Sequence, residues 1–525
     1  AYNYPAVFAP VTGWLDTPAN QKIAYADKML DRSVFATWAQ VKEMEQSGLV
    51  EVASHTHNLH NGINANPSGS QLPAVIAPEY KNGKYETEDA YKNRLKSDFA
   101  HTVQTLVNHI GKKPRVMVWP YGQFNDVAVQ FARQAGMPHY FSLGEKIVNK
   151  VGDKHIGRLL LNAETDLNTV KNYLDGIDES KQIQRVLHVD LDYVYDADKA
   201  QQAKNLDKLI DRIYRYGVTT VYLQAFSDPD GDGVADALYF PNKYLPVRDD
   251  IFGRIAWQLQ TRAGVQVYAW MPVLAFDLRK SVKEAEYVID SRTGKPSTKA
   301  YLRLSPYNKQ NVEIIKSIYN DLSFYAKFNG ILFHDDAFLT DFEGAEGDHA
   351  EGMVSPQAKQ KTQDLIQLTH QLTDALKPYF LRGSYSLKTA RNLYASVITN
   401  PNAEEWLAQN LKTLTDNYDT TAIMAMPYME NEQPISQKEA YQWFASLIEN
   451  VKTQAPLDKV LFEFQAVNWR TQKPIPESEL IDWMTLLQKN HIYSYGYYPD
   501  NFLTNQPDMN KMKPYFSVNT NAGKK

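Results

Sequence analysis

The sequence predicts an α/β protein in which an N-terminal domain of alternating strands and helices precedes a (β/α)8 TIM-type barrel. Three observations lead to this fold class. The chain has 525 residues, well beyond the roughly 250–300 at which one hydrophobic core stops growing, so we expect two domains. Its C-terminal part contains eight strand-like runs, most of them separated by helical runs. Polar and aromatic residues follow these runs, at the end where such a barrel opens.

The composition is that of a globular protein and excludes several functional classes. The chain is 43% hydrophobic and 22% charged, which argues against a disordered or membrane-embedded protein. Its formal net charge of -5 argues against a nucleic-acid partner, because phosphate binding relies on basic patches. The absence of cysteine excludes disulfides, thiol nucleophiles and cysteine-ligated metals.

The N-terminal domain is expected at residues 1–178. Strands are predicted at 6–10, 50–53 and 116–119, and helices at 37–47, 89–110 and 126–135. No signal peptide is recognisable, and the chain starts next to a buried-type strand, so we expect further residues upstream of Ala1. The polar segment 175–181 is the best candidate for a domain boundary.

The second domain is expected at residues 179–525, where the strand–helix alternation becomes regular. The predicted strands are 185–190, 219–225, 266–272, 330–334, 380–384, 421–425, 460–464 and 493–497. The predicted helices include 200–216, 311–328, 359–376, 404–414, 437–451 and 477–489. Eight strands is the number in a (β/α)8 barrel, whose active site lies at the carboxyl ends of the strands.

Three of the 12 histidines lie close together in the segment SHTHNLH, directly after a predicted strand. Neutral imidazoles are common ligands of a catalytic zinc-type ion. On a helix His55 and His60 would lie about 140° apart, whereas on a turn they can converge. His57 alternates away from His55, so we expect it to pack or hydrogen-bond. The alternative is a set of surface histidines with no ligand.

A second motif, Trp119-Pro120-Tyr121-Gly122, also follows a predicted strand. Glycine permits a close backbone approach, and proline fixes the chain direction. A backbone N–H in this segment is suited to stabilise an oxyanion. Pro-Tyr-Gly is also an ordinary turn, and the motif alone does not decide between the two.

Together these motifs resemble the polysaccharide deacetylase family (carbohydrate esterase family 4). With the barrel and its FHDDAF segment in this order, the whole chain resembles the two-domain members that act on poly-β-1,6-N-acetyl-D-glucosamine in biofilm export. The resemblance implies a truncated, (β/α) barrel-like deacetylase domain, a divalent, zinc-type metal on His55 and His60, and an oxyanion site at the Tyr121 backbone N–H. It also implies a periplasmic location, an outer-membrane lipid anchor and an export porin as partner.

The chain departs from the family pattern in one respect. The family needs an Asp–Asp pair on an earlier strand, one as general base and one as the third metal ligand. The first aspartate here is Asp16, which follows the first visible strand. We therefore expect the base and one ligand to lie upstream of Ala1.

The segment Gly330–Asp336 ends a predicted barrel strand with His334, Asp335 and Asp336, and Asp341 follows. Glycosidases use a pair of carboxyl groups, and adjacent carboxylates raise the pKa of one another. Asp335 is predicted as the general acid, with Asp190 and Glu463 as the next candidates. The resemblance places Asp336 and Asp341 in the sugar-binding groove, unless this segment is purely structural.

Two other aromatic residues at strand ends, Tyr428 and Trp469, are predicted to bind sugar, since flat aromatic faces suit sugar rings. The segment Asp228–Gly233 resembles the start of a calcium loop, but Tyr239 occupies the twelfth position, where a bidentate Glu is needed. We expect a turn-rich loop there.

The predicted function is metal-dependent N-deacetylation of the exopolysaccharide, followed by hydrolysis or binding of the partly deacetylated polymer. Two alternatives remain open at the level of sequence. One is a non-catalytic carbohydrate-binding export scaffold, and the other is a barrel glycosidase that acts on an unrelated glucan.

Overall fold

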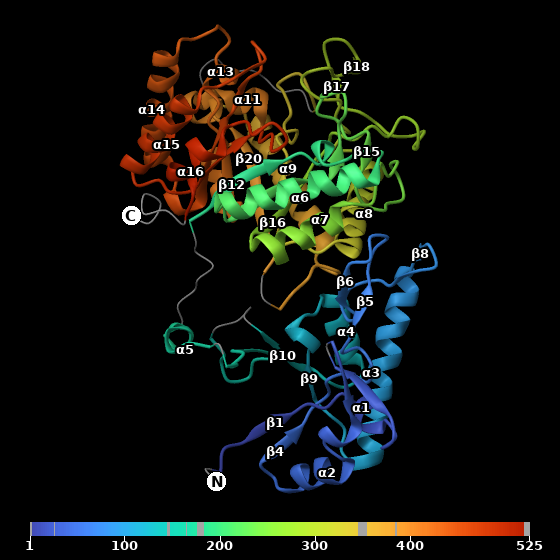
Figure 1. The fold of residues 1–525 in the computed structure, drawn as a ribbon. Helices are drawn as coiled ribbons and strands as arrows, with labels where there is room; N and C mark the ends of the chain where they lie inside the picture. The colour runs from blue at the N-terminus through green and yellow to red at the C-terminus, as the bar shows by residue number, and fades with distance from the viewer. Residues whose placement is uncertain are drawn as a thin grey trace. The chain divides into compact units, whose positions relative to one another are not determined.

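The computed structural model describes residues 3–25, 27–143, 148–163, 165–175, 183–344, 354–383 and 386–518. The chain forms two compact units (Figure 1). The first comprises Ala1–Lys181 with the short segments Ser323–Tyr325 and Lys377–Ser386, and the remaining residues form the second. The expected boundary segment, apart from Asp175, lies outside the described residues. Among the described helices, none has the length and apolarity of a membrane span.

The first unit is built around short parallel strands. Its main elements are β1 (Ala6–Phe8), α1 (Thr12–Asp16), β2 (Lys22–Tyr25), β3 (Lys28–Asp31), α2 (Trp38–Gln46), β4 (Val50–Val52), β5 (Gly62–Asn64), β6 (Gln71–Pro73), β7 (Tyr80–Lys81), β8 (Lys84–Tyr85), α3 (Glu88–Ile110), β9 (Val116–Val118), α4 (Asp126–Gln134), β10 (His139–Leu143), β11 (His155–Arg158) and α5 (Leu167–Leu174). Strand β1 pairs with β4, and β9 to β11 form a parallel sheet in the order β11-β10-β9. A parallel bridge from Ser54 to Met117 connects the segment after β4 to β9.

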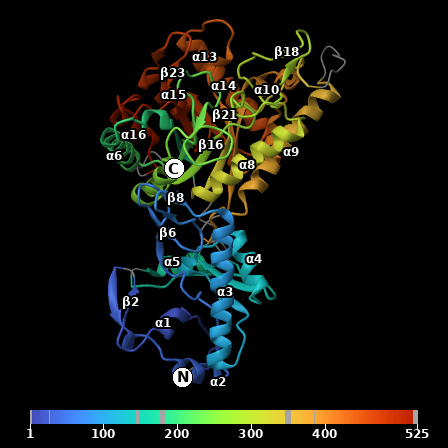
Figure 2. The ribbon, with the colours of Figure 1, turned by 90° about the vertical axis from the view of Figure 1, so that its right-hand side faces the viewer.

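The predicted long helix is confirmed as α3, which packs against α2 and α4 (Figure 2). Its start is capped by the Thr87 side chain, which accepts the Ala90 N–H, and it ends at Gly111, whose φ is 72°. Leu95 and Phe99 on its apolar face are completely buried. The helix therefore supplies a rigid wall behind the histidine segment.

The second unit is a closed parallel barrel, as predicted. Its strands are β12 (Arg185–Val189), β13 (Thr220–Gln224), β16 (Gln266–Met271), β19 (Gly330–Phe333), β20 (Lys388–Tyr394), β21 (Thr420–Met424), β22 (Val460–Gln465) and β25 (Tyr495–Tyr498). Strand β25 closes the barrel on β12, with Gly496 opposite Val186. A Cβ on Gly496 would lie 2.5 Å from the Val186 carbonyl oxygen, so closure at this point requires glycine.

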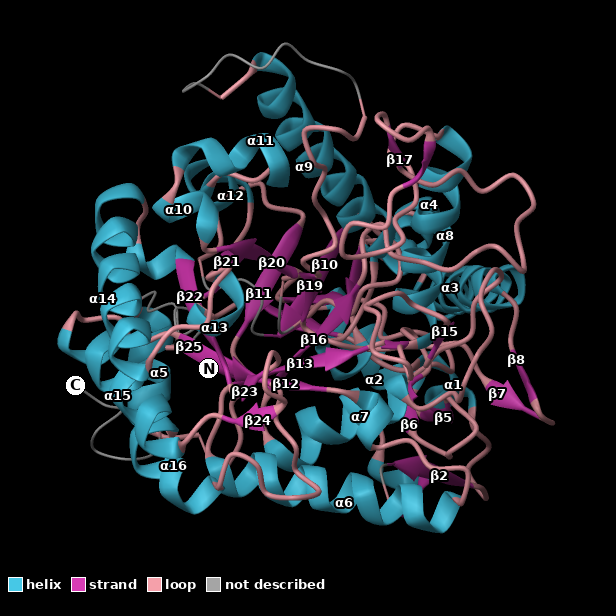
Figure 3. Cartoon of the chain, turned by 90° about the horizontal axis from the view of Figure 1, so that it is seen from above, coloured by secondary structure: helices cyan, strands magenta, loops and turns pink. Residues whose placement is uncertain are grey.

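Helices surround the barrel strands (Figure 3). They are α6 (Lys199–Tyr216), α7 (Phe252–Gln258), α8 (Lys309–Tyr325), α9 (Pro356–Leu376), α10 (Ser396–Thr399), α11 (Glu404–Leu407), α12 (Leu411–Asn417), α13 (Pro427–Glu430), α14 (Gln437–Gln454), α15 (Glu477–Lys489) and α16 (Met509–Phe516). Two-residue ladders occur in the connections: β14 (Phe226–Ser227) with β15 (Ala237–Leu238), β17 (Ile289–Asp290) with β18 (Lys295–Pro296), and β23 (Val467–Asn468) with β24 (Lys473–Pro474).

Two predicted elements differ in the structure. The fifth barrel strand is β20 rather than residues 380–384, because the polar side chains of β20 are buried with partners. Arg391 donates to the Tyr418 hydroxyl and the Ala337 carbonyl, which makes a polar strand tolerable inside the barrel layer. The helix predicted at 404–414 is divided into α11 and α12, since Ala408 adopts a left-handed conformation with φ of 47°.

Candidate functional site

The histidine segment of the first unit leaves β4 as an irregular turn held by backbone hydrogen bonds. The Val118 N–H donates to the Ser54 carbonyl, and the Ser54 N–H donates to the Val116 carbonyl. On the other side the Gly13 N–H donates to the His57 carbonyl at 3.0 Å. A Cβ on Gly13 would meet that same oxygen at 2.6 Å, so glycine permits the approach.

His55 and His60 converge on this turn, with ring centroids 4.8 Å apart. The Nδ1 of His55 lies 2.6 Å from the Val118 carbonyl oxygen. A carbonyl accepts a hydrogen, so Nδ1 carries the proton and Nε2 is left as a ligand atom. Burial lowers the pKa of His55 to about 4 and also lowers that of His60. Both rings are therefore neutral at pH 7, as metal ligation requires.

His57 points elsewhere, as predicted. Its Nδ1 lies 2.9 Å from the Thr12 hydroxyl, and its ring stacks on His101 at 3.9 Å. The buried carboxylate of Asp98 on α3 accepts the backbone N–H groups of His57 and Asn58 at 2.8 and 2.7 Å. Asp98 thus anchors the turn that carries the two converging histidines.

The Pro-Tyr-Gly turn lies beside the same histidines. The ring of Tyr121 lies 4.5 Å from that of His60, and Tyr121 has a left-handed φ of 58°. Gly122 is also left-handed, and a Cβ there would lie 2.7 Å from Leu143. The strained turn therefore carries the Tyr121 side chain against the His60 ring. Trp14, at 5.1 Å from the His60 ring, adds an apolar wall.

The two histidines fit a divalent metal as neutral imidazole donors, but among the described residues no third ligand is assembled beside them. The one cluster of three potential ligands in the described part of the chain is Asp228, Asp230 and Asp232. Asp16 is engaged elsewhere, because it accepts the indole N–H of Trp38 at 2.9 Å.

The Asp228 cluster has the geometry of a turn, as expected. The Asp228 carboxylate accepts the backbone N–H groups of Gly231, Asp232 and Gly233 at 2.9 to 3.1 Å. Its oxygens are used to close the loop.

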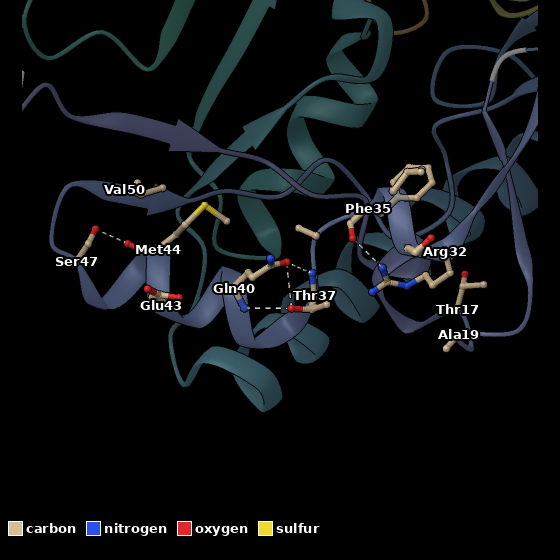
Figure 4. A pocket seen from close by; sticks show the side chains of 13 residues that line it. Thr17, Ala19, Arg32, Phe35, Thr37, Gln40, Glu43, Met44, Ser47 and Val50 are labelled. Carbon is tan, nitrogen blue, oxygen red and sulfur yellow. Dashed lines mark hydrogen bonds between the residues drawn. The ribbon is translucent and has the colours of Figure 1, made fainter. Parts of the chain in front are cut away.

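A hollow of about 1040 Å³ in the first unit lies away from the histidines. Residues of α2 and of the turn before it line most of it (Figure 4), and several of them form local hydrogen bonds. Thr37 and Gln40 form a capping box, for example, and Arg32 donates to the Phe35 carbonyl. None of the predicted site residues lines this hollow.

At the carboxyl end of the barrel strands, unpaired polar atoms gather in one place. His188 lies inside the barrel, with its ring 5.0 Å from Tyr222, 5.2 Å from Trp270 and 5.6 Å from Tyr498. Four buried atoms of this group have no hydrogen-bond partner among the described residues: His188 Nδ1, Asp190 Oδ1, the Tyr222 hydroxyl and Trp270 Nε1. Buried polar atoms are nearly always paired in folded proteins. These atoms therefore form a cluster of unsatisfied polar groups inside the barrel.

Asp335 lies at the same end of the barrel but is fully engaged. Its Oδ2 accepts the hydroxyls of Tyr301 and Tyr394 at 2.9 and 2.8 Å, and its Oδ1 lies 2.5 Å from His334 Nδ1. Burial alone would raise the pKa of Asp335, but His334 and the two tyrosines bring it below its usual value. A general acid must hold its proton, and these contacts instead favour the ionised form of Asp335.

Asp336 is turned away from any sugar and is completely buried. Its carboxylate accepts the backbone N–H groups of Val273, Leu274 and Ala275 at 2.6 to 3.0 Å. The sugar-binding role predicted for Asp336 is therefore corrected: neighbouring side chains on an extended backbone point to opposite faces, and Asp336 shapes the turn after β16.

We expect Asp336→Ala to destabilise the barrel by about 3 kcal/mol or more, since each unsatisfied buried N–H costs about 1–3 kcal/mol. The measurement is urea unfolding followed by tryptophan fluorescence. Asp341→Ala, at a half-buried position, is the control and should change stability by about 0.5 kcal/mol or less. Equal midpoints for the two variants would contradict the structural role of Asp336.

The other predicted sugar-binding residues, Trp469, Tyr428 and Asp341, lie in three different environments. Trp469 is half-buried, with its ring 6.2 Å from Tyr498, so it lies at the barrel mouth. Tyr428 donates its hydroxyl to Glu479 of α15 at 2.5 Å, which directs it toward the helix layer. Asp341 is half-buried in the loop after β19.

The sequence offers Glu463 as an alternative acid but does not single out Asn392, Tyr394 or Trp270, which complete the barrel site. Glu463 lies 2.7 Å from His188 Nε2 and accepts the Asn392 amide at 2.7 Å. Asn392 and Tyr394 both belong to β20, the strand that was misplaced. Trp270 lies near the end of β16 and stacks on His334, with ring centroids 5.2 Å apart. Its position near a strand end is the sequence feature that could have marked it as a site residue.

Comparisons with known proteins match the two parts of the chain to two different families. Residues 188–498 match the profile of a family described as hypothetical glycosyl hydrolase family 13, and residues 1–140 match that of the polysaccharide deacetylases. A poly-β-1,6-N-acetyl-D-glucosamine N-deacetylase of Escherichia coli (strain K12) is 40% identical over 99% of this chain and 80% of the relative. The enzyme of that name from Staphylococcus aureus (strain MSSA476) is 28% identical over 27% of this chain and 42% of the relative.

A solved structure resembles the barrel. The glycoside hydrolase domain of PgaB (BpsB) from Bordetella bronchiseptica is 39% identical, with a TM-score of 0.59. The match covers 65% of this chain and 100% of that domain.

Proposed function

Because the chain belongs to the family of poly-β-1,6-N-acetyl-D-glucosamine N-deacetylases, we propose that it removes acetyl groups from this exopolysaccharide and hydrolyses the partly deacetylated product. Deacetylation is assigned to residues 1–178, and hydrolysis to residues 179–525. The observation that carries the proposal is the convergence of His55 and His60 beside Tyr121, in the part of the chain that matches the polysaccharide deacetylases.

In the deacetylase domain, a divalent, zinc-type metal on His55 and His60 would polarise the amide carbonyl and make water more acidic. The protein's own groups have separate tasks. The Val118 carbonyl orients His55, and Asp98 holds the backbone of the histidine turn. The Tyr121 backbone N–H is assigned to the oxyanion that develops on the acetyl oxygen.

In the barrel, the unpaired polar atoms around His188 are assigned to sugar hydroxyls, and Trp469 with Tyr498 to stacking on a sugar ring. Asp335 is the ionised member of a catalytic carboxyl pair of the kind glycosidases use. The half-buried Asp341 is assigned to the ammonium of a deacetylated glucosamine, which its negative charge attracts.

The location and partner are proposed from the family resemblance. The chain is assigned to the periplasm, held at the outer membrane by a lipid anchor, where it would pass polymer to an export porin. Cell fractionation, and co-purification of the protein with an outer-membrane β-barrel, test this part. Recovery from the cytoplasmic fraction would contradict it.

The enzymatic proposal is tested with two polymers, fully acetylated and partly deacetylated poly-β-1,6-glucosamine. From a chain that also carries the upstream Asp pair, we expect acetate release from the first polymer, which a chelator abolishes and added zinc restores. We expect oligomer release from the second polymer, which the chelator leaves unchanged. Binding of both polymers without either product would instead indicate an export scaffold. Cleavage of an α-glucan alone would indicate an unrelated glycosidase.

A further inference from the structure

We propose that Asp190, at the end of β12, is the general acid that protonates the glycosidic oxygen when the barrel cleaves the polymer. This inference rests on the proposed hydrolase function and assigns the acid role that the environment of Asp335 does not support. The sequence offers Asp190 only as an alternative to Asp335, alongside Glu463.

The side chain of Asp190 lies on the inner face of the barrel. Side chains two positions apart on an extended strand share a face, and Asp190 has extended backbone angles of φ -77° and ψ 120°. His188, two residues earlier, points inward, because its Nε2 reaches Glu463 of β22 across the barrel. Asp190 follows it toward the mouth, where the Tyr498 hydroxyl lies 3.4 Å from Asp190 Oδ2.

Asp190 is also a buried acid at this mouth whose carboxyl group has an oxygen without a hydrogen bond. Its Oδ1 is buried and has no hydrogen-bond partner among the described residues. The neighbouring acids each accept at least two hydrogen bonds from the protein: Asp192, Asp335, Asp336, Glu430 and Glu463. A group that transfers a proton to substrate needs an oxygen that the protein leaves unpaired.

The surroundings favour the protonated form of Asp190. Burial raises its pKa to about 7, and the charges of Asp192 and Asp228 act in the same direction. The Tyr498 hydroxyl and His334 oppose this shift, and the Tyr193 hydroxyl also faces the group. The pKa of Asp190 is raised and that of Asp335 is lowered. Two such carboxyl groups at one end of the barrel provide an acid and an ionised partner at pH 7.

The chemical step balances without another reactant besides water. The Asp190 carboxyl gives its proton to the glycosidic oxygen, and the C1–O bond breaks with its electron pair on that oxygen. The leaving chain thus ends in a hydroxyl. Water supplies a hydroxyl to C1 and releases one proton, and the Asp190 carboxylate takes up a proton from solvent to complete the cycle.

The test compares two substrates that differ in their need for an acid. One is partly deacetylated poly-β-1,6-glucosamine, and the other is a 2,4-dinitrophenyl β-glycoside of a glucosamine oligomer, whose leaving group departs without protonation. A general acid contributes about 10²–10⁴-fold. We expect Asp190→Asn to lose that factor on the polymer and to stay within about threefold of wild type on the dinitrophenyl glycoside. The matched control Asp335→Asn should lose activity on both.

The pH profile gives a second readout that a structural role would not produce. Wild-type kcat/KM on the polymer should fall tenfold per unit above pH about 7, as Asp190 loses its proton. On the dinitrophenyl glycoside this fall should be absent.

The possible results distinguish the role of Asp190 from the hydrolase function on which it depends. Wild-type cleavage with Asp190→Asn unchanged on the polymer, or reduced equally on both substrates, overturns the role of Asp190 alone. Failure of the wild type to cleave either substrate overturns the hydrolase function, and the acid assignment with it.

Discussion

Replacing His55 or His60 by alanine is expected to abolish deacetylation of poly-β-1,6-N-acetyl-D-glucosamine and to reduce the metal content of the protein. Each ring is half-buried, with its pKa lowered by desolvation, and the two ring centroids lie 4.8 Å apart. Loss of a partner that only orients a ligand already costs about 10–100-fold, so loss of the ligand itself should cost at least about 100-fold. Acetate release and elemental analysis measure the two effects.

His57→Ala is the matched control, because His57 belongs to the same turn but stacks on His101. We expect a loss of less than about tenfold and an unchanged metal content. Equal metal content in the wild type and His55→Ala would refute the ligand assignment.

Replacing Asp335 by asparagine is expected to reduce cleavage of the partly deacetylated polymer by about 10²–10⁴-fold, the range for a catalytic carboxylate that transfers or accepts a proton. The change removes the negative charge that Asp335 holds against His334 and the hydroxyls of Tyr301 and Tyr394. Oligomer release measured by chromatography gives kcat and KM separately.

Asp341→Asn is the comparison for this second variant. A half-buried loop carboxylate that pairs with the sugar ammonium should affect KM more than kcat. Cleavage at the wild-type rate by Asp335→Asn would place the ionised carboxylate elsewhere, with Glu463 as the next candidate.

Much of the fold follows from local pattern. Seven of the eight predicted barrel strands coincide with observed strands, because strands buried on both faces are nearly continuous apolar runs. The helix α3 was predicted from its apolar spacing and its terminal Gly111. The convergence of His55 and His60 was predicted from the resemblance, since the residues alone left a surface cluster without a ligand as an alternative.

The remaining assignments depend on contacts between residues far apart in the chain. The sequence of strand β20 is polar. Its Arg391 and Asn392 can be buried because they donate hydrogen bonds to Tyr418, Ala337 and Glu463. No local pattern carries that information, because the partners lie 27 to 71 positions away.

The roles of the barrel acids depend on the same kind of contact. Asp335 and Asp336 are adjacent in sequence, yet one is held by His334 and two tyrosines and the other by three backbone amides of a different strand end. The proton affinity of a carboxyl group is set by burial and by neighbouring donors and charges. Sequence patterns placed these acids at the mouth of a barrel. Only the tertiary structure shows that burial raises the pKa of Asp190, that His334 and two tyrosines lower that of Asp335, and that Asp336 is held by backbone amides, because folding brings these neighbours within a few ångströms.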